Sequence, residues 1–176
     1  MPKVYLSLGA NLESPFRSLI TAITQIKKMQ GVTFKKRSAI YLTSPVSKIP
    51  QNEYLNLCCL IETNLPPIDL FQALKLLEEK FGKIPPHYQG PRTLGIDILF
   101  YENQKLETQE FTLPHPEWQN CLFYLIPLYE ISKTIEFPGE APIEISPLIE
   151  NFSLTDTQKI TIYHHMKEPN ETIQNS

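Results

Sequence analysis

The stretch from Gly90 to Tyr101 contains the residues whose types and spacing best suit phosphate chemistry. Arg92 is followed five positions later by the carboxylate of Asp97. An arginine binds phosphate oxygens through several N–H groups, and a carboxylate is a common ligand of divalent metal ions. His115, which stands between two prolines, is a third candidate. Each of these residues taken alone is more often an ordinary surface or loop residue. Whether they form a site therefore depends on the secondary-structure elements that position them.

The strand that carries Asp97 is predicted by a change in composition. Gly90 and Pro91 favour a turn, whereas the residues from 96 to 101 are mostly strand formers. Alternate side chains of a strand point to opposite faces. One apolar face is expected to contain Leu94, Ile96, Ile98 and Phe100, and the other face Thr93, Gly95, Asp97 and Leu99. Asp97 therefore lies near the middle of a strand, where a solvent-facing role and a metal-binding role are both open.

The charge of the chain argues against an extended basic surface. Its 176 residues include 16 Lys and Arg and 19 Asp and Glu, which gives a formal net charge of -3. We therefore expect no nucleic-acid and no membrane partner, and any anionic ligand has to be met by local residues. No run approaches the roughly 20 apolar residues of a membrane span, and the N-terminus begins with a strand pattern rather than a signal peptide.

Common signatures of phosphate binding, hydrolysis and metal binding are absent from the sequence. There is no Gly-rich phosphate loop ending in Lys-Ser or Lys-Thr, no Gly-x-Gly-x-x-Gly and no Gly-x-Ser-x-Gly. The cysteines, Cys58, Cys59 and Cys121, lack the two-residue spacing of a zinc or redox motif. A reduced, cytoplasmic location fits these cysteines best.

The order of the predicted elements indicates an α+β fold. Apolar spacing and Pro or Gly boundaries predict strands at 4–8, 32–43, 54–61 and 96–101, helices at 14–31, 66–82 and 123–131, and a hairpin at 106–112. This order is typical of a ferredoxin-like antiparallel sheet with helices packed mainly on one face, here extended by the hairpin and an extra helix. The second face of the sheet would then be free to form a site.

One domain is expected to span residues 1–151, because this length is enough to bury a core. Residues 152–176 are mainly polar and are predicted to form a C-terminal tail that is partly disordered. Within the domain, the basic run from Lys35 to Arg37 marks the strand at 32–43 as an edge strand, and a phosphate-binding patch is the alternative.

Two polar residues stand on predicted apolar faces. Asn56 shares a strand face with Tyr54 and needs partners either in the protein or in a ligand. Glu78 follows Leu74 by four positions and borders the buried stripe near the end of a helix. The helix dipole favours a cation there, so Glu78 is expected to have a cationic or metal partner.

Several spaced motifs together resemble the hydroxymethyldihydropterin pyrophosphokinases, a family of folate synthesis, from about Val4 to Ile149. The motifs are Gly9-Ala10-Asn11-Leu12, Tyr41-Leu42-Thr43-Ser44-Pro45, Tyr54-Leu55-Asn56, Gly90-Pro91-Arg92-Thr93-Leu94 with Asp97, and Leu113-Pro114-His115-Pro116. The resemblance implies an enzyme that transfers the terminal diphosphate of ATP to the hydroxymethyl group of 6-hydroxymethyl-7,8-dihydropterin and releases AMP.

The resemblance also implies the role of individual residues. The pterin pocket would be lined by Thr43, Ser44, Val46, Tyr54, Asn56 and Phe123. The ATP site would contain Glu78, Lys83, Arg92, Ile98, Thr112 and His115. Asp97 would bind Mg²⁺, and Asp97 and Arg92 would be the catalytic residues. The expected partners are ATP and the reduced pterin, with another folate-pathway enzyme as a further partner of a monomeric chain.

Some positions depart from the pattern of that family. Gly95 stands where the family has the first carboxylate of Asp-x-Asp, and Cys121 stands where it has an arginine. Lys75 replaces a common glutamine, and the residues from 84 to 89 contain no arginine. Because phosphoryl transfer depends on positioning and electrostatic stabilisation, these changes predict weak or lost activity.

Two other functions remain as alternatives. The chain is either an enzyme or a non-catalytic domain that retains the pterin pocket and docks to another folate enzyme. An RNA-binding ferredoxin-like domain is disfavoured, because the chain lacks both a basic balance and clustered aromatic residues on the sheet.

Overall fold

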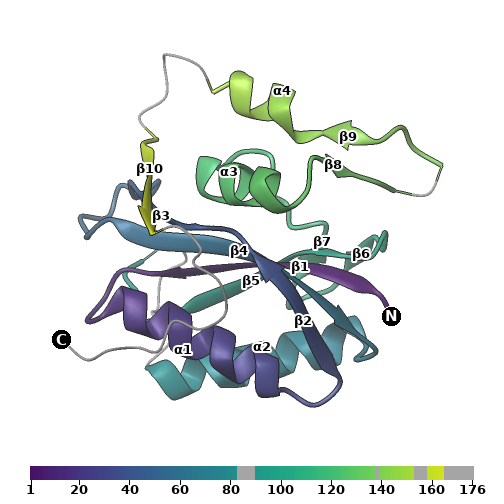
Figure 1. Ribbon diagram of the computed structural model, residues 1–176, viewed down its shortest axis with the longest axis horizontal. Helices are drawn as coiled ribbons and strands as arrows, with labels where there is room; N and C mark the ends of the chain where they lie inside the picture. Colours follow the sequence, from purple (N-terminus) through teal and green to yellow (C-terminus); the bar gives the residue numbers. More distant parts are fainter. Residues whose placement is uncertain (83–89, 138, 153–157, 165–176) are drawn as a thin grey trace.

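The computed structural model of the chain describes residues 1–82, 90–137, 139–152 and 158–164 (Figure 1). Up to β5 its elements follow the order that the sequence predicts, with the second strand in two parts. In chain order they are β1 (Lys3–Ala10), α1 (Pro15–Lys28), β2 (Val32–Arg37), β3 (Ile40–Thr43), β4 (Tyr54–Thr63), α2 (Pro67–Phe81), β5 (Gly95–Tyr101), β6 (Leu106–Glu107), β7 (Thr112–Leu113), α3 (Leu122–Ile131), β8 (Thr134–Ile135), β9 (Ile143–Glu144), α4 (Ile145–Glu150) and β10 (Ile160–His164).

A six-stranded antiparallel sheet organises these elements. Its strands run in the order β10-β3-β4-β1-β5, and β2 pairs with β4 as well. β1 lies between β4 and β5 and is antiparallel to both. The ferredoxin-like arrangement predicted from the sequence is therefore confirmed.

The strand predicted at 32–43 is divided into β2 and β3 at Ser38. The backbone N–H of Ser38 donates to the carbonyl oxygen of Cys58 at 2.8 Å, and the hydroxyl oxygen of Ser38 accepts from the N–H of Cys58 at 3.0 Å. β2 pairs with the second half of β4, and β3 with the first half. The hydroxyl of Ser38 takes the place of a backbone acceptor. The N–H of Cys58 therefore keeps a hydrogen bond although the strand is interrupted at Ser38. Within the described chain β2 pairs with β4 alone, so it is an edge strand, as predicted.

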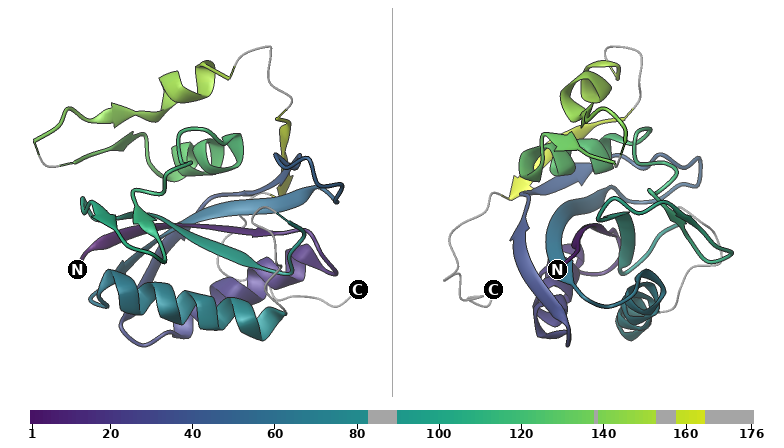
Figure 2. Two further views of the ribbon diagram at one scale, coloured as in Figure 1. Left: turned by 180° about the vertical axis from the view of Figure 1, so that it is seen from behind. Right: turned by 90° about the vertical axis from the view of Figure 1, so that its right-hand side faces the viewer.

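Helices cover both faces of the sheet (Figure 1, Figure 2). α1 and α2 lie against one face, and α3 lies against the other. The larger core is enclosed by α1 and α2 and includes Leu6, Leu19, Ile61, Leu74 and Ile96. The second face was expected to be free to form a site, but only part of it is free, because the apolar helix α3 has to bury its own side chains and packs against β4. A site on that face has to lie beside α3.

The alternation predicted for β5 holds up to Ile98 and then fails. Ile96 and Ile98 belong to the core under α1 and α2, as predicted. Phe100, predicted on the same face, instead joins Leu99 in the core beneath α3. The pairing of β1 with β5 shifts in register at this point, and such a bulge moves every later side chain to the opposite face. Tyr101 thereby takes the place that was expected for Phe100.

Part of the predicted C-terminal tail belongs to the sheet. β10 pairs with β3, and just before it the backbone of Lys159 exchanges hydrogen bonds with Ser44. The boundary between a domain and a tail at residue 151 stays a prediction. None of the helices in the described parts of the chain is long and apolar enough to cross a membrane.

Candidate active site

A cavity lies on the second face of the sheet, beside the N-terminal end of α3. Its walls come from three stretches that are far apart in the sequence, and its floor is formed by β1 and β5. The described residues that border it are Ser7, Gly9, Thr43, Ser44, Pro45, Val46, Gln51, Tyr54, Asn56, Arg92, Gly95, Asp97, Glu117, Cys121, Phe123 and Tyr124.

Two glycines lie side by side in the floor of the cavity. Gly9 of β1 pairs with Gly95 of β5, and two residues further along Ser7 pairs with Asp97. A Cβ atom at Gly9 would lie 2.4 Å from Oδ1 of Asn56, so a side chain there would collide with that amide. The absence of a side chain at Gly9 therefore lets Asn56 reach across the floor.

The wall formed by β3 and β4 is tied together by its own polar groups. The side chain of Asn56 is 5% exposed, and its Nδ2 donates to Oγ1 of Thr43 at 2.6 Å. The hydroxyl of Tyr54 lies 2.6 Å from the carbonyl oxygen of Gly90 and 2.9 Å from Oε1 of Gln51. Since the hydroxyl has one proton, it donates to one of these acceptors at a time.

The structure brings all of the predicted pterin residues to this one cavity. They come from the end of β3, the loop after it, the beginning of β4 and the beginning of α3, and they are Thr43, Ser44, Val46, Tyr54, Asn56 and Phe123. Flat aromatic ligands are commonly held by an aromatic ring together with a few fixed polar groups, and this wall offers both. Their role in binding a pterin stays a prediction.

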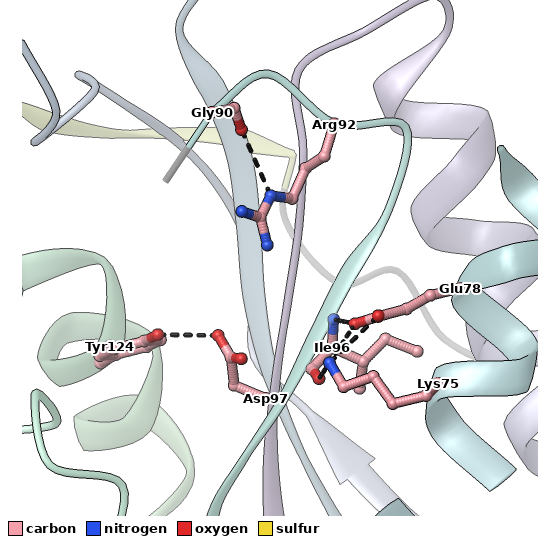
Figure 3. A network of polar contacts seen from close by, with 7 residues as sticks. All are labelled: Lys75, Glu78, Gly90, Arg92, Ile96, Asp97 and Tyr124. Atoms are coloured by element: carbon pink, nitrogen blue, oxygen red, sulfur yellow. Dashed lines mark hydrogen bonds and ion pairs between the residues drawn. The ribbon is translucent and has the colours of Figure 1, made fainter. Parts of the chain in front are cut away.

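Asp97 points into the cavity and is held by a residue that the sequence did not single out. The hydroxyl of Tyr124 donates to Oδ2 of Asp97 at 2.7 Å (Figure 3). Tyr124 follows Phe123 in an apolar helix, and a buried tyrosine hydroxyl needs a polar partner. The sequence could therefore have indicated that Tyr124 has a polar partner. It could not have identified that partner, because Asp97 lies 27 positions away and is brought close only by the fold.

Arg92 borders the same cavity and is fixed through its backbone. Its N–H donates to Oδ1 of Asn11 at 2.9 Å, and its carbonyl oxygen accepts from the N–H of Asn11 at 3.0 Å. Asn11 is 3% exposed and also donates to Oε1 of Gln51 and to the carbonyl oxygen of Asn52. Asn11, which the sequence marked only as part of a motif, thus links Arg92 to the loop before β4.

Glu78 lies on the other side of β5 from Asp97 (Figure 3) and does not border the cavity. Its carboxylate accepts from the N–H of Ile96 at 2.5 Å and from Nζ of Lys75 at 2.9 Å, and Nζ also lies 3.3 Å from the carbonyl oxygen of Ile96. Burial raises the pKa of Glu78, and Lys75 opposes this rise. Lys75 is the cationic partner that was expected for Glu78. Together the two side chains provide hydrogen-bond partners for the backbone N–H and carbonyl oxygen of Ile96 in β5.

Three further residues predicted for the ATP site also lie outside the cavity lining. Ile98 is buried in the core under α1 and α2, and Thr112 lies in the short strand β7. The N–H of His115 donates to the carbonyl oxygen of Leu99 at 2.9 Å. Together with Glu78, these residues lie along β5 or against it rather than in the cavity. Lys83 is outside the described residues.

His115 is connected to Asp97 through Tyr124. The rings of His115 and Tyr124 are 5.0 Å apart, and Nδ1 of His115 accepts from the N–H of Glu117 at 3.2 Å. Burial lowers the pKa of His115, while the charges of Asp97 and Glu117 act in the opposite direction. His115 therefore supports the wall behind Asp97.

The carboxylates in the cavity do not form a complete metal cage. In the described stretches no group of three or more His, Cys, Asp or Glu side chains is placed to hold a metal ion. One carboxylate is nevertheless enough for Mg²⁺ when phosphate oxygens and water supply the other ligands, so Asp97 fits an ion that arrives with a nucleotide.

Burial raises the pKa of Cys121 to about 12, so its thiol stays neutral near pH 7.

The sequence matches a known family over most of its length. A family model described as 7,8-dihydro-6-hydroxymethylpterin-pyrophosphokinase (HPPK) matches residues 5–133. The chain is 31% identical over 153 residues to the 2-amino-4-hydroxy-6-hydroxymethyldihydropteridine pyrophosphokinase of Haemophilus influenzae, covering 87% of this chain and 94% of that protein. It is 34% identical over 132 residues to the protein of the same name in Bacillus subtilis, covering 75% and 79%.

Larger proteins also contain a similar part. The chain is 30% identical over 176 residues to the Bifunctional protein FolKE of Lactococcus lactis subsp. cremoris, of which it spans 49%. A crystal structure of an HPPK-DHPS with substrates has a TM-score of 0.66 at 12% identity, and Plasmodium falciparum HPPK-DHPS with SDX-DHP has 0.63 at 14%. These two matches cover 86% of this chain but 43% and 44% of those chains, and they concern the fold alone.

Proposed function

The chain belongs to the 7,8-dihydro-6-hydroxymethylpterin-pyrophosphokinase family, and on that premise we propose that it is a transferase of folate biosynthesis. It transfers the terminal diphosphate of ATP to the hydroxymethyl group of 6-hydroxymethyl-7,8-dihydropterin and releases AMP. One observation carries this proposal: the six residues expected for the pterin border a single cavity whose floor also holds Asp97 and whose lining includes Arg92.

The pterin is proposed to bind at the wall formed by β3, β4 and the start of α3. Phe123 supplies an aromatic face for the flat ring, and Asn56 supplies an amide that can match the donor and acceptor edge of a pterin. Thr43 holds that amide in place through its hydroxyl. A ring fixed in this way presents its hydroxymethyl group to the part of the floor that holds Asp97.

The chemistry requires a new bond between the pterin hydroxymethyl oxygen and the β-phosphorus of ATP. The bond from that phosphorus to the oxygen bridging the α and β phosphates breaks, the hydroxyl proton is lost, and AMP leaves with the bridging oxygen. Arg92 donates to phosphate oxygens and stabilises the charge that shifts towards AMP. Asn11 and Tyr124 keep Arg92 and Asp97 in position before the substrates bind.

Mg²⁺ is proposed to enter together with ATP, and Asp97 would hold it. When bound, the ion supplies positive charge to the phosphate oxygens. The nucleotide is proposed to lie beside β5, near Glu78, Thr112 and His115. Ile98, which the resemblance also assigns to the ATP site, is a buried residue of the same strand. Lys83 is proposed as a further contact to ATP. With Gly95 and Cys121 in place of a carboxylate and an arginine, we expect slow turnover.

The other proposed properties concern where the protein acts and with which partners. The cysteines Cys58, Cys59 and Cys121 are free and buried, which supports a reducing, cytoplasmic location. Relatives in which a similar part is joined to a second one, such as FolKE, support association with another folate enzyme. We expect the chain itself to be a monomer.

Formation of AMP tests the proposal directly. Purified protein is incubated with ATP, Mg²⁺ and the reduced pterin, and AMP is followed by chromatography while ³¹P NMR detects the new pterin diphosphate. We expect AMP to form only when the pterin is present. If the folded protein binds the pterin but leaves ATP intact, the enzyme proposal fails and the chain is a non-catalytic pterin-binding domain.

A further inference from the structure

Arg92 is the one cationic side chain among the described residues that border the cavity. Its backbone is fixed by Asn11, as described above, and its carbonyl oxygen also accepts from the N–H of Leu12 at 3.2 Å. Its Nε–H donates to the carbonyl oxygen of Gly90 at 3.4 Å, which is a long hydrogen bond. Since the backbone cannot move freely, the atoms next to the side chain decide where the guanidinium lies.

The side chain of Arg92 lies over Gly95. A Cβ atom at Gly95 would be 2.8 Å from Cδ of Arg92 and 3.0 Å from its Nη1, and its third neighbour at 3.6 Å is Nε of the same residue. Cδ lies in the middle of the side chain, so relief of this contact would carry the whole guanidinium to a new position. Figure 3 shows the guanidinium on the same side of β5 as Asp97.

We propose that Gly95 is a positioning residue, which keeps the guanidinium of Arg92 in the floor of the cavity on the side of Asp97. The space that a side chain at position 95 would fill is then part of the phosphate-binding site, because the guanidinium of Arg92 occupies it. This inference rests on the proposed function, in which the diphosphate of ATP is the anion that Arg92 meets. It also gives Gly95 a role other than the loss of a carboxylate.

Gly9 provides a matched control, because it lies opposite Gly95 and has a different neighbour. A Cβ atom at Gly9 would meet Asn56 rather than Arg92. Substitution of Gly9 should therefore affect the pterin wall, and its effect should be the same whether or not Arg92 is present. Substitution of Gly95 should act through Arg92 alone.

A double-mutant cycle tests this dependence. The ligand is Mg²⁺ with an ATP analogue that carries a methylene group between the α and β phosphates, and its Kd is measured by calorimetry. We expect Gly95→Ala to weaken binding on the order of tenfold, as for loss of a charge-assisted hydrogen bond. In an Arg92→Ala background the same change should have almost no effect. An equal loss in both backgrounds would overturn the proposal.

A second measurement needs no ligand. The chain has three arginines, Arg17, Arg37 and Arg92, so the Nε–H signal of Arg92 in a ¹⁵N NMR spectrum can be assigned with Arg92→Lys. Gly95→Ala should shift this signal and leave the other two in place. An unchanged Arg92 signal in folded Gly95→Ala would contradict the proposal. A shift in a protein that forms no AMP would refute the proposed function and retain the role of Gly95.

Folding and the alternative role of Gly95 are tested by two further variants. If Gly95→Ala lowers the Tm, Arg92→Ala should restore it, because the three nearest atoms to the new Cβ all belong to Arg92. A Tm that stays low in the double variant contradicts the proposal. Gly95→Asp separates the two roles of the position: a lost carboxylate predicts faster AMP formation, whereas displacement of Arg92 predicts slower AMP formation.

Discussion

The pterin side and the phosphate side of the cavity are built in different ways. The pterin side consists of Thr43, Tyr54, Asn56 and Phe123, and its polar groups mostly bind one another or the backbone of nearby loops. A site of this kind is expected to bind its ligand without a large rearrangement.

The phosphate side consists of Arg92, Gly95 and Asp97, and it is held by residues of other elements. Asn11 fixes the backbone of Arg92, and Tyr124 fixes the carboxylate of Asp97. It has one cation, Arg92, and one carboxylate, Asp97. The cation suits a polyphosphate, and the carboxylate suits the metal ion that accompanies it. On the proposed function, we therefore expect the pterin side to determine which acceptor binds and the phosphate side to determine how fast the transfer occurs.

Arg92→Ala should produce the largest effect, and this effect should be much larger on the phosphate side than on the pterin side, which Arg92 touches at Tyr54. Removal of one preorganised donor to a developing negative charge typically lowers kcat by about 10²-fold or more. The Kd of the pterin in the absence of nucleotide should change little. AMP formation and pterin fluorescence titration measure the two quantities. Arg17→Ala, a change of an exposed arginine on α1, is the control and should leave both as in the parent protein.

A loss of pterin affinity in Arg92→Ala comparable to the loss of kcat would show that the two sides are not separable. The cavity would then be one coupled site.

Asn56→Ala should produce the converse result. The change removes a buried amide and leaves Oγ1 of Thr43 without that donor, and loss of such a buried hydrogen bond costs about 1–3 kcal/mol. We expect the Kd of the pterin to rise by about tenfold or more, on the same energy scale. The Kd of the ATP analogue with Mg²⁺ should stay the same. Asn64→Ala, at an exposed position after β4, is the matched control.

Tyr124→Phe tests whether the phosphate side is held by α3. The change removes the hydrogen bond to Oδ2 of Asp97 but keeps the aromatic ring against His115. Partners of metal ligands typically contribute about 10-fold to 100-fold in metal affinity or activity. We expect the Mg²⁺ concentration that gives half-maximal AMP formation to rise by about tenfold, at the low end of that range. An unchanged Mg²⁺ requirement would mean that Asp97 needs no such support.

The residues that the resemblance assigns to the pterin all border the cavity, whereas most of the described residues that it assigns to ATP do not, and the reason is physical. Thr43, Tyr54 and Asn56 lie on adjacent strands that local apolar patterns define well. Their meeting at one cavity follows once β3 and β4 pair. The support of Asp97 by Tyr124 instead depends on the packing of α3 onto the second face of the sheet, and no local pattern encodes that distance.

The misjudged parts of the fold have a similar cause. The bulge that moves Phe100 to the other face arises from the register between β1 and β5, which alternation within one strand cannot reveal. Ser38 divides a strand because its hydroxyl reaches the backbone of Cys58 on β4. β10 is a short strand in a polar stretch, and it forms because the edge of β3 offers a partner.

Gln158→Ala should have a smaller effect on the pterin side. Oε1 of Gln158 accepts from the N–H of Leu122 at 2.9 Å, and Nε2 lies 3.4 Å from the carbonyl oxygen of Asn120, so Gln158, two residues before β10, holds the start of α3. Loss of an ordinary hydrogen bond costs about 0.5–1.5 kcal/mol. We expect the Kd of the pterin to rise by about threefold, on that scale. Gln25→Ala, on the exposed face of α1, is the control.

Equal pterin affinity in Gln158→Ala and in the parent protein would mean that the start of α3 is fixed by α3 itself. The C-terminal strand would then be an addition to the sheet with no part in the site.

The smallest expected effect is a dependence of stability on pH that comes from His115 behind the phosphate side. Burial lowers the pKa of His115 in the folded state below its ordinary value of 6.5. Below pH 6.5 the unfolded chain therefore binds a proton more readily than the folded one, so the contribution of His115 to stability is complete above pH 6.5 and falls as the pH drops towards the lowered pKa. The difference in Tm between the parent protein and His115→Gln should favour the parent most at pH 8. This difference should become smaller as the pH falls towards 5. Because the ring of His115 packs on Tyr124, the affinity for the ATP analogue with Mg²⁺ should fall over the same range, while pterin affinity falls less. A parallel pH dependence of Tm in both proteins would show that His115 is not the group that links acid pH to the phosphate side.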